Sequence, residues 1–245
     1  MSLPLTLGNT LTLYYVNATS LAKTHAVQHL HSEIFANRVD VALIAESWFS
    51  ARHLDADVAV DGYLLFRRDR FQRKGGGVCA YVDARLSCKL FRPCVNHNLV
   101  EILWLKVCSE TELYFIACAY HPPKPKYDSK VFHNELAAGI DAITHLYPSS
   151  IIVIAGDFNQ LDTCVFEVDN GLSQLVDSTT CLIRYLQTGL IYTMHIVLPV
   201  SSKPNTWQSW FLHRATTLMQ SSCTDPIRLR CMICVVITST SCIIF

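Results

Sequence analysis

The sequence lacks an excess of either charge and lacks a long apolar run. Its 20 Lys and Arg residues balance 20 Asp and Glu residues, so the formal net charge is zero. This excludes a global basic field, and any nucleic-acid contact must come from a local patch. Residues 231–245 are apolar but shorter than the roughly 20 residues of a membrane-spanning helix. We therefore expect no membrane partner.

Cysteine pairs with the spacing of a zinc site are also scarce. Of the eleven cysteines, only Cys231 and Cys234 have close metal-type spacing, and no second pair or histidine follows them. Several others lie inside apolar runs, where free cysteine behaves as a small hydrophobe. The first 13 residues have no basic segment before a sustained apolar stretch, which argues against a signal peptide. We expect a reduced, monomeric protein of the nucleus or cytoplasm rather than a disulfide scaffold.

What the sequence does have is an apolar run that stops abruptly at polar residues. Residues 151–155 read IIVIA, and Gly156 and Asp157 follow, with Asn159 two positions later. A short β-branched run of this kind predicts a buried strand. Alternation along the chain would point Asp157 and Asn159 the same way and turn Phe158 into the core. These residues either bind a hydrated cation beside a phosphate or merely shape the turn.

Strands and helices alternate up to about residue 160, which predicts an α/β fold with one sizeable core. Strands are expected at 11–16, 39–45, 58–66, 77–82, 101–107, 113–120 and 151–155, and helices at 20–37 and 131–146.

Polar residues end several of these expected strands. Glu46 follows the run VALIA, Asn17 ends the first strand, and Tyr120 precedes His121 and two prolines. Taken singly, each is as easily a solvated strand end or a rim tyrosine. Together with Asp157 they mark one end of a layered α/β fold, where polar groups commonly form a site.

At this point the chain resembles the endonuclease/exonuclease/phosphatase superfamily, and more narrowly the endonuclease domain of non-LTR retrotransposons. The resemblance covers roughly residues 10–180. It rests on the order and spacing of Asn17, Leu21-Ala22-Lys23, Ile44-Ala45-Glu46-Ser47-Trp48, Gly62-Tyr63, Arg67-Arg68-Asp69-Arg70, Gly75-Gly76-Gly77-Val78, Ala119-Tyr120-His121-Pro122-Pro123 and Ala155-Gly156-Asp157-Phe158-Asn159. It implies a four-layer α/β/β/α sandwich of two packed mixed sheets, and cleavage of a DNA phosphodiester with Mg²⁺ or Mn²⁺.

The resemblance also implies a role for each strand-end residue. Glu46 would hold the cation, and Asn17 would support that site. Asp157 would orient or deprotonate the attacking water, Asn159 would bind the phosphoryl oxygen or the water, and Tyr120 would support the phosphate. This chemistry needs a polarising cation, an aligned water and donors for developing charge.

A basic stretch fits the same function. Five cations lie within eight residues and precede three glycines, which suits contact with a DNA backbone. They are Arg67, Arg68, Arg70, Arg73 and Lys74. The alternative is a solvated hairpin loop. Trp48 and Trp104 are expected in the core.

The C-terminal part departs from the family pattern. The family closes its site with a Leu-Asp pair and a later Ser-Asp-His, but Gly189 stands where the first Asp is expected and no Ser-Asp-His follows. Neither His195 nor His213 has a preceding Asp. We therefore expect a sandwich that is incomplete at the C-terminus, and we divide the chain into an endonuclease-like domain, 1–180, and a divergent tail, 181–245. The tail is partly family-like to about 198 and otherwise poorly structured or frame-shifted. Impaired nicking is expected. The alternatives are an inactive nucleic-acid-binding remnant and a phosphatase of the same superfamily.

Overall fold

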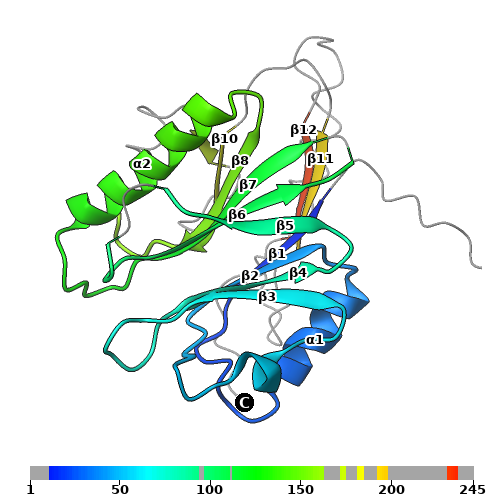
Figure 1. Cartoon of the computed structure of the whole chain (residues 1–245), viewed down its shortest axis with the longest axis vertical. Helices are drawn as coiled ribbons and strands as arrows, with labels where there is room; N and C mark the ends of the chain where they lie inside the picture. The colour runs from blue at the N-terminus through cyan, green and yellow to red at the C-terminus, as the bar shows by residue number, and fades with distance from the viewer. Residues whose placement is uncertain are drawn as a thin grey trace, which may run out of the picture.

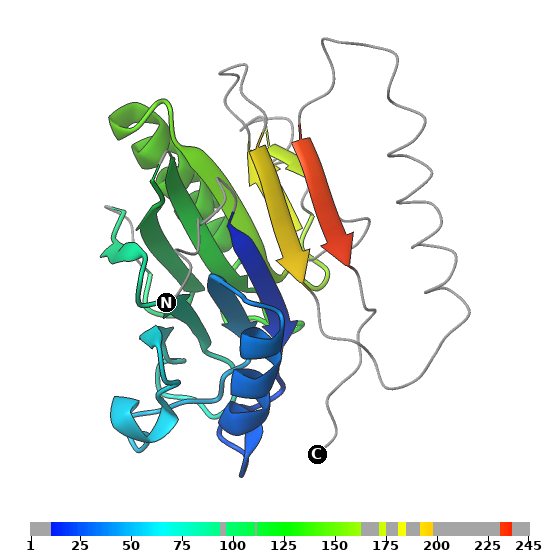
Figure 2. The ribbon, with the colours of Figure 1, turned by 90° about the vertical axis from the view of Figure 1, so that its right-hand side faces the viewer.

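A computed structural model of the chain describes residues 11–93, 97–110, 112–162, 172–174, 181–184, 192–197 and 231–236. Two mixed sheets pack face to face, and each carries one α-helix on its outer side (Figures 1 and 2). This is the four-layer α/β/β/α sandwich that the resemblance implied.

The first sheet is built around two parallel strands, β1 (Thr12–Asn17) and β2 (Val41–Ala45). On the far side of β2 lie two antiparallel strands, β4 (Val78–Asp83) and then β3 (Tyr63–Arg68). On the far side of β1 lie β11 (Tyr192–Val197) and β12 (Cys231–Val236), both parallel to it. The parallel register aligns the carboxyl ends of β1 and β2, where Asn17 stands opposite Ala45.

The second sheet has the order β5-β6-β7-β8-β10-β9. Its strands are β5 (Ser87–Phe91), β6 (Glu101–Cys108), β7 (Leu113–Tyr120), β8 (Ile151–Asp157), β9 (Leu172–Gln174) and β10 (Cys181–Arg184). β6 and β7 pair antiparallel as a hairpin. β7 and β8 are parallel, so Tyr120 and Asp157 lie opposite each other at the end of the pair.

Alternation along the strands divides the core into three layers. Leu43 of β2 and Ile116 of β7 belong to the cluster between the sheets, whereas Ile44 faces helix α1 (Ala26–Ala36). Helix α2 (Ser129–Leu146) packs on the other sheet through Phe132 and its neighbours. β2 is therefore buried on both faces, which explains why all five of its residues are apolar.

Two local predictions were wrong at their boundaries. The first helix begins at Ala26 and not at residue 20, because the backbone N–H groups of Ser20 and Leu21 donate to Glu46 and Ser47 carbonyls, both at 2.9 Å. The expected strand 58–66 starts only at Tyr63, and a 3₁₀ turn, η1 (Asp55–Val58), precedes it. Strand β5 was not foreseen.

Strands β10, β11 and β12 belong to the segment that the sequence analysis assigned to the tail, and β11 covers the edge of β1. His195 lies in β11, whose side chains are not described, whereas Gly189 and His213 lie outside the described residues. Within the described ranges Cys79, Cys88, Cys108 and Cys118 are free, and Cys79 and Cys118 are fully buried, as expected. None of the described helices is long and apolar enough to cross a membrane.

Candidate functional site

Asn17, Glu46 and Asp157 meet at the edge where the two sheets end. The Asn17 side-chain amide donates to Glu46 Oε1 at 3.0 Å and to Asp157 Oδ2 at 2.9 Å. Its oxygen accepts from the backbone N–H of Thr19 at 3.0 Å, which fixes the orientation of the amide. One carboxamide thus holds two carboxylates that come from opposite sheets and lie far apart in the sequence.

The chain after β2 reaches this site in an unusual backbone conformation. Glu46 and Trp48 have φ angles of 56° and 58°, in the left-handed region that non-glycine residues rarely occupy. The conformation is held by backbone hydrogen bonds from Ser47 to Gly77 and from Trp48 to Gly76, at 3.1 and 2.8 Å. Such strain persists only where the surroundings impose it, and it is concentrated at functional sites.

Trp48 is a site residue that the sequence analysis placed in the core. It is half-buried, and its indole N–H donates to Glu46 Oε2 at 3.1 Å. Both Glu46 oxygens are therefore oriented by donors, one from Asn17 and one from Trp48. Its position two residues after Glu46 was the available signal. Trp104, by contrast, lies in the core as expected, with 3 % of its surface exposed.

Asp157 and Asn159 fill the turn-shaping role, one of the two alternatives that the sequence left open. The Asn159 backbone N–H donates to Asp157 Oδ1 at 3.2 Å, so Asp157 does shape the turn after its strand. Its other oxygen faces Asn17. The Asn159 carboxamide donates to the His121 carbonyl at 2.7 Å, which ties the ends of β7 and β8 together. Phe158 is fully buried, as the alternation predicted.

Tyr120 lies beside Glu46, to which its side chain is hydrogen-bonded, and 5 % of its surface is exposed. Burial raises the pKa of its hydroxyl, and the charge and hydrogen bond of Glu46 raise the pKa further. Tyr120 therefore stays a neutral donor across the physiological range. Two residues before Tyr120 and Glu46, a second contact joins the two sheets: the Cys118 thiol donates to the Ile44 carbonyl at 3.5 Å.

The donor chemistry of the site suits a hard cation. No group of three or more His, Cys, Asp or Glu side chains that could enclose a metal occurs in the described part of the chain. Mg²⁺ commonly binds proteins through one or two carboxylates and keeps several waters. Glu46 and Asp157, oriented by Asn17, supply the two carboxylates that such a Mg²⁺ site needs.

The basic stretch is largely engaged inside the protein. Arg67 pairs with Asp69 and Asp55, at 2.5 and 2.9 Å. Arg68 donates to the Ile102 carbonyl at 2.9 Å and pairs with Glu135 at 3.5 Å. Both arginines lie in strand β3 and not in a free loop. Arg68 links the two sheets through Ile102 of β6, whereas Arg67 ties the end of β3 to η1.

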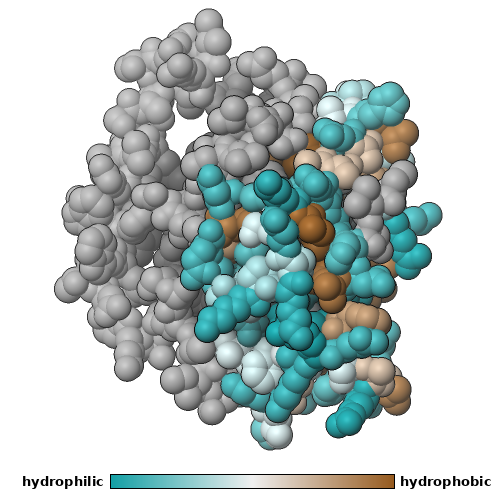
Figure 3. All heavy atoms as spheres, turned by 90° about the vertical axis from the view of Figure 1, so that its left-hand side faces the viewer, coloured by the Kyte–Doolittle hydropathy of each residue, from teal (hydrophilic) through white to brown (hydrophobic). Residues whose placement is uncertain are grey.

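Arg70 is paired as well, with a buried carboxylate that the sequence analysis missed. It contacts Glu101 at 2.6 Å, and Glu101 also accepts the backbone N–H of Gly77. Burial raises the pKa of Glu101, and the hydrogen bond from Arg70 opposes that shift. Arg73 and Lys74 are exposed and form no ion pair with any described residue. On the side of the molecule at the left of Figure 1, most of the described side chains at the surface are hydrophilic (Figure 3).

A four-layer sandwich with carboxylate and amide side chains at the shared edge of its sheets has the architecture of the superfamily that the sequence resembles. The sequence model of the Endonuclease/Exonuclease/phosphatase family matches residues 7–218. The chain belongs to this family. The matched range extends beyond residue 180 into the segment assigned to the tail.

Two solved structures share the fold. One is D. rerio TDP2 humanized by 14 mutations, with 16 % identity and a TM-score of 0.51 over 71 % of this chain and 82 % of that chain. The other is the endonuclease domain of TRAS1, a telomere-specific non-LTR retrotransposon, with 14 % identity and a TM-score of 0.51 over 69 % of this chain and 83 % of that chain. A search among curated proteins found no match.

Proposed function

We propose that this chain is a nicking endonuclease of the retrotransposon type, which hydrolyses a DNA phosphodiester with Mg²⁺ or Mn²⁺. The observation that carries the proposal is the Asn17 amide, which holds the Glu46 and Asp157 carboxylates within hydrogen-bonding distance of one point. Two carboxylates kept together without a cationic partner between them form a site that a divalent cation would stabilise.

Each side chain then has a definite task. Glu46, supported by Asn17 and Trp48, holds the cation, which when bound polarises the phosphoryl oxygen and neutralises developing charge. Asp157 orients the attacking water and accepts its proton, while the Asn159 N–H keeps the carboxylate in place. Tyr120 donates its hydrogen bond toward the phosphate, because its proton is retained. Asn159 contributes its carboxamide oxygen to the position of the water.

The DNA backbone would be contacted by the exposed end of the basic stretch. Arg73 and Lys74 supply phosphate contacts, and the glycines after them permit close approach. Arg67 and Arg68 serve this contact indirectly, because their bonds within the protein fix the start of the loop. The TRAS1 domain, a retrotransposon endonuclease of the same fold, supports DNA as the substrate.

We expect slow cleavage, because the sequence has no Ser-Asp-His segment to supply the last donor to the phosphate. Loss of one such donor commonly lowers the rate by about 10²–10³.

The experiment is nicking of supercoiled plasmid by the full chain, with Mg²⁺ or with EDTA. We expect weak Mg²⁺-dependent nicking that Glu46→Ala and Asp157→Ala abolish. Asp141→Ala, which removes an exposed carboxylate of α2, is the matched control and should nick normally. Wild-type protein that nicks no faster than Asp157→Ala would contradict the proposal. Salt-dependent DNA retention in EDTA would then favour the inactive remnant, and hydrolysis of small phosphate esters would favour the phosphatase.

A further inference from the structure

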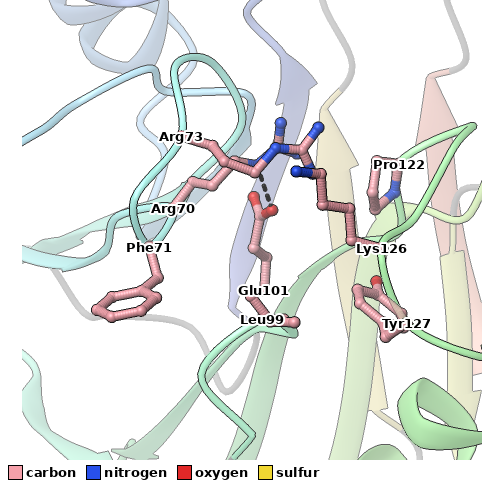
Figure 4. Close-up of a pocket in the computed structure, with 8 residues that line it drawn as sticks. All are labelled: Arg70, Phe71, Arg73, Leu99, Glu101, Pro122, Lys126 and Tyr127. Carbon is pink, nitrogen blue, oxygen red and sulfur yellow. Dashed lines mark hydrogen bonds and ion pairs between the residues drawn. The ribbon is translucent and has the colours of Figure 1, made fainter.

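A narrow pocket beside the site gathers cations from two loops. It is lined by Arg70, Phe71, Arg73, Leu99, Glu101, Pro122, Lys126 and Tyr127. Arg70 and Arg73 come from the loop between β3 and β4, and Lys126 comes from the loop between β7 and α2. Figure 4 shows these three side chains converging above Glu101, with Phe71 and Tyr127 on opposite flanks. The pocket is therefore positively charged although the whole chain is neutral.

The charges in the pocket are only partly compensated. Glu101 is its one acidic residue, and its carboxylate is already bound by Arg70 and the Gly77 N–H. Arg73 and Lys126 are exposed and pair with no carboxylate in the described ranges. Two buried polar atoms of the lining, Arg70 Nη2 and the Tyr127 hydroxyl, have no hydrogen-bond partner within the described structure. Exposed cations that no carboxylate neutralises attract an oxyanion, so Arg73 and Lys126 favour an anionic ligand at the mouth of the pocket.

The pocket adjoins the carboxylate site through Arg70. The Arg70 guanidinium lies over the Tyr120 ring, with Cζ 5.4 Å from the ring centroid. Glu101 stands opposite Tyr120 in the β6–β7 pair, and Pro122 follows Tyr120 by two residues. A phosphate in the pocket would therefore neighbour one held at Tyr120, as successive phosphates of one strand do.

Phe71 adds a feature that phosphate binding alone does not need. Its side chain is 48 % exposed, among the large hydrophobic residues that the described surface leaves open. An exposed ring beside cations that track a backbone is the arrangement that stacks unpaired bases. A base inside a duplex is already stacked and paired, and is not free to lie on such a ring.

We propose that the exposed cations at the mouth of this pocket bind the phosphate next to the scissile one, and that the base of that nucleotide stacks on Phe71. The proposal rests on the proposed nuclease function and narrows its substrate to a strand that is single-stranded on one side of the cut. Arg73 and Lys126 bind the flanking phosphate, and Arg70 couples it to Tyr120.

The test is fluorescence anisotropy of the full chain in EDTA, so that cleavage plays no part. The probes are a single-stranded oligothymidylate, an abasic strand of equal length, and a fully paired duplex. Phe71→Ala should weaken oligothymidylate binding about 10-fold and leave the abasic strand and the duplex unchanged. Arg73→Ala and Lys126→Ala should weaken both single strands, each lowering the slope of log affinity against log salt by about 0.7.

Matched controls exist elsewhere on the surface. Phe35→Ala removes a ring that is 73 % exposed on α1, and Lys89→Ala removes an exposed cation of β5. Both should bind every probe as the wild type does. The inference is overturned if Phe71→Ala matches Phe35→Ala on oligothymidylate, or if Lys126→Ala matches Lys89→Ala. If the wild type binds the probes but one of these variants matches its control, only the pocket proposal fails and the nuclease proposal stands. If Asp157→Ala still nicks plasmid, the nuclease proposal fails, and the binding results for the pocket are unaffected.

Discussion

The Asn17 amide is the most informative single group to change. Asn17→Asp keeps the size of the side chain but replaces the N–H donor with a third carboxylate. The contacts to Glu46 and Asp157, now hydrogen bonds of 3.0 and 2.9 Å, would become repulsions between like charges. The variant therefore tests whether the two carboxylates share one site.

The expected effect follows from Coulomb's law and from the partial exposure of the site. Two like charges about 4 Å apart repel by about 4 kcal/mol at an effective dielectric constant of 20. Asn17 is half-buried, so screening by solvent lowers this figure. We expect the free energy of unfolding in EDTA to fall by about 2–4 kcal/mol. Asn17→Ala, which removes two hydrogen bonds to charged acceptors and the one accepted from the Thr19 N–H but adds no charge, should lose about 1–3 kcal/mol.

The assay is urea unfolding, followed by circular dichroism, in EDTA and in excess Mg²⁺. A cation that binds only the folded protein stabilises it by about 2.7 kcal/mol at 100 times its dissociation constant, so Mg²⁺ should restore most of the Asn17→Asp loss. Asn37→Asp, at the exposed end of α1, is the control, and Mg²⁺ should stabilise it by as much as it stabilises the wild type. An Asn17→Asp protein as stable as the wild type in EDTA, or equally weakened with and without Mg²⁺, would refute the reasoning.

Two further predictions concern the surroundings of the site. Gly156→Ala would place a Cβ 2.2 Å from the Ala119 carbonyl oxygen on the neighbouring strand, so the free energy of unfolding measured in urea should drop by about 3 kcal/mol. The control Gly62→Ala, where φ is positive but the space is open, should lose about 1 kcal/mol. Equal losses for the two variants would contradict this prediction. Burial, and then the charge of His133, lower the pKa of His121 below 6.5. The unfolded chain therefore binds more protons below pH 6.5, and wild-type stability should fall as the pH drops through that value more than the stability of His121→Phe does; parallel urea-derived profiles for the two proteins would count against it.

The sequence predicted the strand ends well because their signal is local. Apolar runs with β-branched residues identified β2 and β8, and the residue after each run was necessarily at the sheet edge. Parallel pairing of β1 and β2 brings Asn17 and Glu46 to one edge of the first sheet, and the packing of the second sheet against it brings Asp157 to them. The roles of these residues in binding and catalysis remain proposals.

What the sequence did not reveal depends on pairs that are distant along the chain. Nothing near Arg70 indicates that its partner is Glu101, and nothing near Ser20 indicates that its N–H is taken by the Glu46 carbonyl. The helix propensity of residues 20–25 was overruled by that pairing. The same limit hid the structural use of Arg67 and Arg68, which read as free cations when only the charge pattern is considered.

The apolar core between the two sheets sets the distance between the carboxylates at the sheet edge. Glu46 is anchored to one sheet and Asp157 to the other, so the thickness of the apolar layer between them determines how far apart the two oxygens stand. A methyl group removed at Leu43 or Ile116, deep in that layer, would let the sheets settle closer and would alter the width of the gap. Core residues far from Glu46 and Asp157 would thereby set the spacing of the two carboxylates on which the proposed cation site depends.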